Sequence, residues 1–268
     1  MKKIAILGCG WLGFPLAKSL IANDFDVSGS TTTFEKLELL SQSHINPFLI
    51  SLSENNIEGN IDEFLIEKDI LIIDVPPKLR GINRENFVQK IANCIPYIEK
   101  SSIDKVIFIS STSVFEDDNS IINDKKIPNA TSEAGKQLFA VEKLLQSNPN
   151  FETTVIRFGG LVGADRHPAK MLAGRSGIEN PDAVINLIHL EDCIAIIQKV
   201  ILKNFWNTSF NAVAQFHPSR ETYYKKKTIE FGLPAPTFDQ SNPSIGKIVE
   251  SKLVIEVLEH DFLWVEKI

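Results

Sequence analysis

The chain has 268 residues, of which 43% are hydrophobic, and its 34 acidic and 28 basic side chains give a formal net charge of −6. This composition predicts a globular protein with a sizeable core. The sequence has no extended basic stripe, so we expect neither a nucleic acid nor an anionic membrane surface as a partner. Three widely separated cysteines share no metal-ligand spacing, which favours reduced thiols, a cytoplasmic location and no metal site.

The opening segment predicts a strand, a glycine turn and a helix. Lys3 to Leu7 is a short apolar run rich in β-branched residues, and apolar positions at helical spacing follow from Leu12. Pro15 is best tolerated in the first turn of this helix, so we expect the helix to begin near Trp11 or Leu12. Glycines interrupt the opening apolar run before it could serve as a secretion signal. No later segment reaches the roughly 20 apolar residues that a membrane-spanning helix needs.

Strands and helices are then expected to alternate as far as residue 160. The predicted strands lie within FDVSGS (25–30), PFLISL (47–52), DILIIDVPP (69–77), KVIFISSTSVF (105–115) and TTVIRFGG (153–160). The predicted helices span 34–42, 87–98 and 134–145. This alternation indicates an α/β fold of the Rossmann type, a doubly wound parallel sheet with helices on both faces. Ligands of such sheets bind beyond the carboxyl ends of the strands.

The alternation ends after Gly160. The stretch LVGADRHPAKMLAGR is polar and typical of a loop, and a helix is expected from Ile194 to Leu202. His189 is predicted to be a hydrogen-bonded core residue and Asp192 to cap the helix. We therefore expect residues 1–160 to form the Rossmann domain, and residues 161–268 to form a smaller mixed lobe that is interleaved with the sheet.

The sequence GCGWLG places three glycines in the first strand-to-helix turn, where they favour dinucleotide binding over a simple structural turn. Gly8 would permit the turn, Gly10 would let the backbone approach a pyrophosphate, and Gly13 would let helix and strand pack closely. The helix N-terminus, at Trp11 and Leu12, would supply free amide donors and partial positive charge. Trp11 is also expected to shield the loop from solvent.

The end of the second strand favours NADP over NAD, because it carries none of the acidic residues that bind the ribose 2′-hydroxyl. Three hydroxyl side chains there are candidate donors to a 2′-phosphate: Ser30, Thr31 and Thr32. Lys36 lies one turn further on. The alternative is that the hydroxyls only cap the helix near Phe34. Pro76 and Pro77 are expected to line the ribose or adenine of the cofactor, unless they only end their strand.

Three further stretches, VIFISSTSVF, SEAGKQLFAVEKLL and NLIHLEDCIAII, carry a family resemblance together with the glycine loop. The sequence resembles an extended short-chain dehydrogenase/reductase of the NAD-dependent epimerase/dehydratase superfamily. Through GCGWLG, RFGGLVGADRHPAKMLAGR and NLIHLEDC it is similar to the atypical, YeeZ-like subgroup. The resemblance implies a Rossmann domain that binds NAD(P), a C-terminal substrate lobe, and oxidoreductase or epimerase-like activity.

The resemblance also implies catalytic positions. Members of the family that catalyse redox chemistry use a serine or threonine after the fifth strand. Ser111 matches this position, Thr112 is a second candidate beside it, and Ser110 is expected to contact the cofactor.

The same members carry a Tyr-x-x-x-Lys pair on the next helix, where the lysine lowers the pKa of the tyrosine. Ala134 stands at the tyrosine position and Leu138 at the lysine position, and neither side chain can transfer a proton. Ser132 and Lys136, four residues apart on one helix face, are a weaker substitute pair. Tyr223 and Tyr224 could supply a phenol, although a surface aromatic pair is the favoured interpretation.

A basic cluster follows the sixth strand, on the side of the sheet where ligands bind. It consists of Arg166, His167, Lys170 and Arg175. Such a cluster could bind a phosphorylated or carboxylated substrate, or could be a solvated loop.

Two hypotheses remain for the whole chain. In the first, it is an enzyme that acts on a small-molecule substrate, anionic or nucleotide-linked, with a homodimer as the candidate assembly. In the second, it is a non-catalytic NAD(P)-binding sensor. Both need the same cofactor site, so the fold alone does not separate them.

Overall fold

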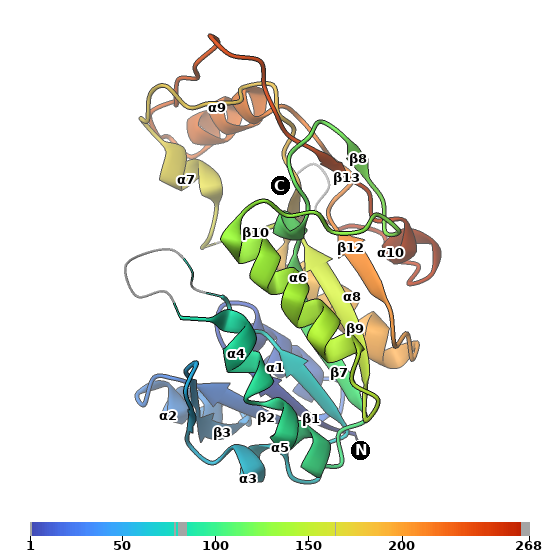
Figure 1. The fold of residues 1–268 in the computed structure, drawn as a ribbon. Helices are drawn as coiled ribbons and strands as arrows, with labels where there is room; N and C mark the ends of the chain where they lie inside the picture. Colours follow the sequence, from blue (N-terminus) through green and yellow to red (C-terminus); the bar gives the residue numbers. More distant parts are fainter. Residues whose placement is uncertain (1, 78, 80–84, 164, 264–268) are drawn as a thin grey trace.

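The centre of the protein is a parallel sheet of seven strands (Figure 1). This computed structural model describes residues 2–77, 79, 85–163 and 165–263. The strands lie in the order β12 (Ser209–Ala212), β9 (Glu152–Phe158), β7 (Lys105–Ser111), β6 (Ile70–Ile73), β1 (Lys3–Leu7), β2 (Asp26–Thr31) and β3 (Asn46–Leu49). The chain winds outward from β1 in one direction and from β6 in the other, so the switch point lies between these two strands. The predicted doubly wound Rossmann fold is confirmed.

Helices cover both faces of the sheet. On one face lie α1 (Gly13–Ile21) and α8 (Leu190–Leu202), and on the other lie α4 (Phe87–Ala92), α5 (Ile95–Lys100) and α6 (Glu133–Gln146). Alternate residues of β1 enter the two cores, because successive side chains of a strand point to opposite faces. Ile4 and Ile6 pack with α1 and α8, whereas Ala5 and Leu7 pack with the other helices. Shorter helices α2 (Lys36–Gln42) and α3 (Ile61–Leu65) flank the sheet.

Several predicted elements differ from those observed. The predicted helix 87–98 is divided into α4 and α5, because Pro96 stands in the first turn of a new helix. The predicted strand 47–52 is divided at Ile50 into β3 and β4 (Ser51–Leu52), and β4 pairs with β5 (Ile57–Glu58). The strand predicted over 105–115 ends at Ser111, where the 3₁₀ turn η1 (Thr112–Val114) begins.

The residues after Gly160 form a second, smaller group of elements and also return to the sheet. β10 (Gly160–Val162) pairs with β11 (Leu187–His189), and β13 (Ile248–Val249) pairs with β8 (Ile121–Ile122). The stretch predicted as a polar loop contains α7 (Pro168–Leu172), which packs on α9 (Arg220–Glu230) at the top of Figure 1. This part of the chain also supplies β12, α8 and α10 (Lys252–Glu256).

The start of α8 corrects two predictions. The helix begins at Leu190, and its N-cap is His189, whose Nδ1 accepts the Glu191 amide at 3.3 Å. Asp192 is fully buried and accepts hydrogen bonds from His260 Nε2 at 2.9 Å and from the Leu263 amide at 2.8 Å. Asp192 therefore attaches the C-terminal segment to the core and does not cap the helix.

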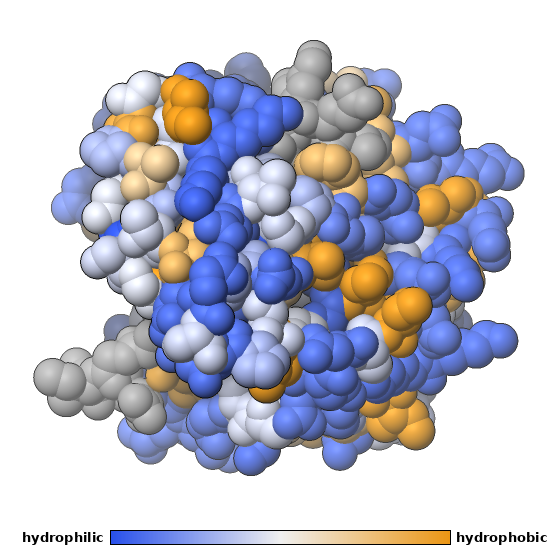
Figure 2. Space-filling view, turned by 90° about the horizontal axis from the view of Figure 1, so that it is seen from above, coloured by the Kyte–Doolittle hydropathy of each residue, from blue (hydrophilic) through white to orange (hydrophobic). Residues whose placement is uncertain are grey.

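The surface seen from above, over α7 and α9, is mostly hydrophilic, with apolar side chains in small groups (Figure 2). In the part of the chain that the structure describes, every helix is too short or too polar to cross a lipid bilayer.

Candidate functional site

The glycine loop lies between β1 and α1, beside the switch point of the sheet. Gly8 has a φ of +110°, and its amide donates to Ser30 Oγ at 2.9 Å. A Cβ on Gly8 would lie 2.4 Å from the Asp74 carbonyl oxygen, and a Cβ on Gly13 would lie 2.2 Å from the Gly8 carbonyl oxygen. Contacts within the chain therefore account for the first and third glycines.

Gly10 differs from the other two, because a Cβ built on it meets nothing within 4 Å. This exposed residue lines a cavity of about 460 Å³ beside the loop. The Gly13 amide donates to Asp74 and the Phe14 amide to the Gly10 carbonyl oxygen, which leaves the amides of Trp11 and Leu12 for a ligand among the residues described. Of the three glycines, only Gly10 has free space beside it, as the close approach of a pyrophosphate to the backbone requires.

The far end of this cavity is lined by residues that follow β2. Thr32 and Lys36 are exposed there, whereas Ser30 and Thr31 are buried. Ser30 holds the glycine loop through its hydroxyl, and Thr31 Oγ1 accepts the Thr33 amide at 3.1 Å. Two of the three predicted hydroxyl groups thus already have a partner within the chain.

The cavity is completed by residues that follow β6 and by residues at the start of α4. They include Asp74, Val75 and Pro76, together with Glu85 and Lys90, which form an ion pair with each other. Pro77 follows as a half-buried residue.

Asp74 places a carboxyl group directly below the glycine loop. Burial raises its pKa to about 7, while the Gly13 amide and the positive charge of Arg166 act in the opposite direction. Sequence reasoning missed Asp74, although its position directly after a buried strand at the switch point was a usable signal.

Cys9 is buried inside the same loop and packs on Gly29, where a Cβ would lie 2.4 Å from Cys9 Sγ. Burial raises the pKa of this thiol to about 12, so it stays protonated. Its small size therefore explains its presence.

Trp11, the residue after Gly10, joins the glycine loop to the C-terminal part of the chain. Its Nε1 donates to Asp165 Oδ1 at 2.8 Å, and the guanidinium of Arg166 lies 5.0 Å from the centre of its ring. A Cβ on Gly163 would lie 2.8 Å from the same ring. Gly163, Asp165 and Arg166 thus all contact the indole.

The other residues of the predicted basic cluster point elsewhere. His167 Nδ1 accepts the Ala169 amide at 3.2 Å, so the neutral ring carries its proton on Nε2, which lies 2.9 Å from the Tyr223 hydroxyl. Burial lowers the pKa of His167 to about 4. Lys170 Nζ lies 5.6 Å from the centre of the Phe231 ring, and the side chain of Arg175 is exposed. The described contacts therefore do not bring the four basic residues together around one ligand.

Tyr223 and Tyr224 are only 3% and 8% exposed, and both belong to the core between α7 and α9. The prediction of a surface aromatic pair is wrong. The run of lysines beside them suggested a solvated helix face, but the apolar residues of α7 cover the tyrosines.

Ser110 lies at the end of β7 and is 4% exposed. Its hydroxyl donates to Glu142 Oε1 at 2.5 Å, and Glu142 forms an ion pair with Arg157 at 2.7 Å. The hydroxyl of Ser110 thus belongs to a buried polar network between α6 and β9.

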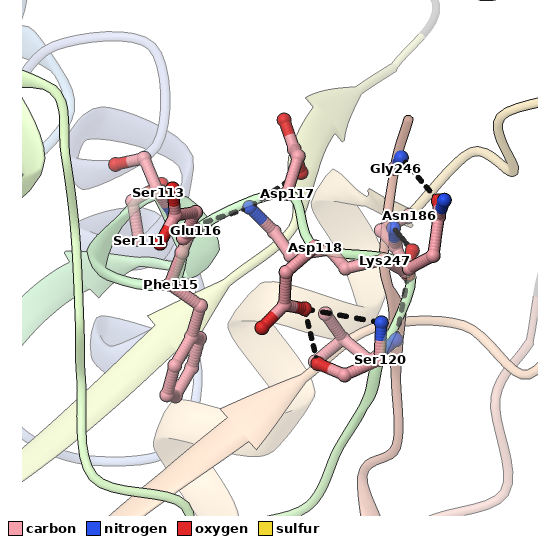
Figure 3. Close-up of polar contacts among 12 residues, drawn as sticks. Ser111, Ser113, Phe115, Glu116, Asp117, Asp118, Ser120, Asn186, Gly246 and Lys247 are labelled. Carbon is pink, nitrogen blue, oxygen red and sulfur yellow. Dashed lines mark hydrogen bonds and ion pairs between the residues drawn. The ribbon is translucent and has the colours of Figure 1, made fainter. Parts of the chain in front are cut away.

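Ser111 begins the turn that leads away from the sheet (Figure 3). Its Oγ accepts the Ser113 amide at 3.1 Å, and Thr112 behind it is buried. Lys247, which sequence reasoning missed, donates from Nζ to the Phe115 carbonyl at 2.6 Å and pairs with Asp117 at 2.9 Å (Figure 3). Lys247 therefore binds the turn after Ser111 to the C-terminal segment.

The start of α6 packs against this turn, because a Cβ on Gly135 would lie 2.2 Å from the Ser113 carbonyl oxygen. Ala134 is half-buried in the first turn of the helix, and Leu138 is 4% exposed and belongs to the core. The hydroxyl of Ser132 caps the helix by accepting the Gly135 amide at 3.2 Å, and Lys136 is exposed. Among the described residues, there is also no group of histidine, cysteine or carboxylate side chains that could hold a metal ion.

Comparison with known proteins shows the family. No family model matches the chain. The chain is 32% identical over 264 residues to the protein YeeZ of Escherichia coli strain K12, covering 98% of this chain and 96% of that protein. The chain belongs to the YeeZ family. The resemblance predicted from its motifs is thereby confirmed.

Solved structures of other proteins share the fold of this chain. A superfamily protein from Agrobacterium tumefaciens with bound NAD has a TM-score of 0.79 and 13% identity, covering 99% of this chain and 95% of that one. UDP-glucuronic acid 4-epimerase from Bacillus cereus, in complex with NAD, has a TM-score of 0.77 and 15% identity, covering 97% and 91%. At these identities the likeness shows the shared fold.

Proposed function

We propose that this protein is an NAD(P)-dependent oxidoreductase or epimerase-like enzyme that acts on a small anionic or nucleotide-linked substrate. The observation that carries the proposal is Gly10, the glycine whose missing side chain leaves space for a ligand and not for the protein. The NAD found in the two solved structures of the same fold supports this interpretation.

The residues around the cavity fit a nicotinamide dinucleotide. Gly8, Gly10 and Gly13 would form its loop, with the amides of Trp11 and Leu12 facing the pyrophosphate. When bound, the nicotinamide would supply hydride transfer, and the protein would supply binding and orientation.

The adenosine end of the cavity supports a preference for NADP. The exposed Thr32 and Lys36 can donate to a 2′-phosphate, and Pro76 lines the same space. Fluorescence titration of the purified protein with NADPH and NADH tests this preference. Tighter binding of NADPH is expected, and tighter binding of NADH would overturn it.

We propose Ser111 as the catalytic side chain that contacts the substrate, with Thr112 beside it as a second candidate. Its hydroxyl lies at the carboxyl end of β7, on a turn held by α6 and by Lys247. Ala134 and Leu138 offer no proton donor, so the usual Tyr-x-x-x-Lys mechanism has no counterpart at these positions. Lys136 remains a weaker candidate, because its exposed side chain is free to reorient.

A turnover screen tests the catalytic proposal. Purified protein and NADPH are assayed against carbonyl-containing metabolites, comparing wild type with Ser111→Ala. Ser113→Ala is the matched control, since it removes an exposed hydroxyl from the same turn. We expect turnover that Ser111→Ala lowers and Ser113→Ala preserves. Equal rates in wild type and Ser111→Ala would remove Ser111 from the mechanism.

The second candidate function is a non-catalytic NAD(P) sensor, favoured by the apolar residues at 134 and 138. Cofactor binding without turnover of any substrate would support it. A cytoplasmic location and a homodimer belong to the same proposal, and the free state of all three cysteines fits a reducing compartment. Sedimentation at several protein concentrations tests the dimer.

A further inference from the structure

Arg166 lies on the cofactor side of the molecule and not within a substrate-binding cluster. Gly163 and Arg166 face each other across a turn and are joined by two backbone hydrogen bonds, from the Gly163 amide to the Arg166 carbonyl at 2.8 Å and from the Arg166 amide to the Gly163 carbonyl at 3.1 Å. The two bonds fix where the Arg166 side chain leaves the turn.

This turn is held on Trp11 by three separate contacts. Asp165 accepts the indole N–H, Gly163 packs against the ring, and Arg166 lies over the ring face. A guanidinium over an indole is attracted by the negative ring face. Because Trp11 directly follows Gly10, the positive charge is held beside the open glycine.

The positive charge of Arg166 also acts on the carboxyl group of Asp74. Arg166 lowers the pKa of Asp74, whose carboxyl group lies below the loop and receives the Gly13 amide. Arg166 forms no salt bridge with any described carboxylate, and its neighbour Asp165 is engaged by Trp11. The guanidinium is thus exposed and oriented, and it forms no salt bridge with the residues described.

We infer that Arg166 binds the pyrophosphate of the dinucleotide, with Trp11 as the platform that orients it. The inference rests on the proposed function. A guanidinium presents several N–H donors in one plane, which suits the oxygens of a phosphate. The amides of Trp11 and Leu12 would hold one side of the pyrophosphate and Arg166 another.

The same contact would connect cofactor binding to the C-terminal lobe. The residue after Arg166 is His167, which caps α7 and contacts Tyr223 of α9. A ligand that holds Arg166 would therefore contact the residue that directly precedes the N-cap of α7.

Binding of nucleotide fragments tests the inference without any assay of activity. ADP, which carries a pyrophosphate, and adenosine, which does not, are titrated by calorimetry into wild type and Arg166→Met. The control is Lys18→Met, which removes another cation from an aromatic ring, here 5.8 Å from the centre of Phe14 on α1. Thermal melting checks that each variant is folded.

We expect Arg166→Met to weaken ADP binding about tenfold, the equivalent of about 1.4 kcal/mol, and to leave adenosine binding unchanged. The loss of affinity on adding salt should also be smaller in this variant, because one charge contact is gone. Arg166→Lys should be intermediate, and Lys18→Met should match wild type.

An unchanged ADP affinity in Arg166→Met would overturn the inference and leave the proposed function in place. Equal weakening of ADP and adenosine would also overturn it, because Arg166 would then act through the shape of the loop. Wild-type protein that binds neither ADP nor NADPH would overturn the inference together with the proposed function.

Discussion

Asp74→Asn should change how the stability of the fold depends on pH. The pKa of Asp74 is about 7 in the folded protein, and an unfolded aspartate titrates near 3.9. Between pH 5 and 7 the folded state therefore keeps a proton that the unfolded state has lost. The free energy of unfolding then falls as pH rises, by at most about 1.4 kcal/mol per pH unit.

Over two pH units this slope lowers the free energy of unfolding by at most about 2.7 kcal/mol. Asp74 is half-buried, so solvent screening reduces the expected decrease to about 1–2 kcal/mol. Asparagine does not titrate, so the free energy of unfolding of Asp74→Asn should not show this decrease with pH. The variant should therefore be more stable than wild type at pH 7.5. Urea unfolding of both proteins at pH 5 and 7.5 measures the difference. Asp239→Asn is the control and should retain the wild-type slope, because hydrogen bonds from Ser241 lower the pKa of Asp239 and keep it ionised over this range. Parallel wild-type and Asp74→Asn profiles would refute the burial of a protonated carboxyl below the glycine loop.

Three further predictions concern the loop and the core. Gly8→Ala should lower the melting temperature, because its Cβ would lie 2.4 Å from the Asp74 carbonyl oxygen. Gly10→Ala should melt like wild type and bind NADPH more weakly. A lower melting temperature in Gly10→Ala than in Gly8→Ala would contradict the assignment of the loop. Arg157→Met should lower the free energy of unfolding in urea by about 3–5 kcal/mol, because it leaves the buried Glu142 without its ion-pair partner. A decrease below about 1 kcal/mol would show that the ion pair is dispensable. Cys9 should not react with a thiol reagent in the native protein at pH 8, and rapid modification would show that the loop opens.

The sheet and the glycine loop could be predicted from the sequence because their signals are local. The buried run Ile70–Ile73 and the alternation of strands and helices determine the doubly wound sheet. The three glycines follow a strand and open a helix, so their place in the fold required no tertiary information. The division of a predicted helix into α4 and α5 was harder to predict, because it depends on a single residue, Pro96.

The partners of the site residues could not be predicted, because they come from distant parts of the chain. Asp165 is 154 residues from Trp11, and Tyr223 is 56 residues from His167. The spacing of the basic residues indicated one cluster, but Arg166 lies over the ring of Trp11, whereas His167 at the start of α7 contacts Tyr223 of α9. Sequence neighbours can point in different directions when a turn and a helix start separate them.

A crystal structure of the protein grown with millimolar NADPH tests the central claim most directly. The account predicts that the pyrophosphate lies against Gly10 and the amides of Trp11 and Leu12, with the adenosine in the cavity that Thr32 and Lys36 line. Crystals in which that cavity holds only water, or in which the indole of Trp11 closes the loop, would contradict it.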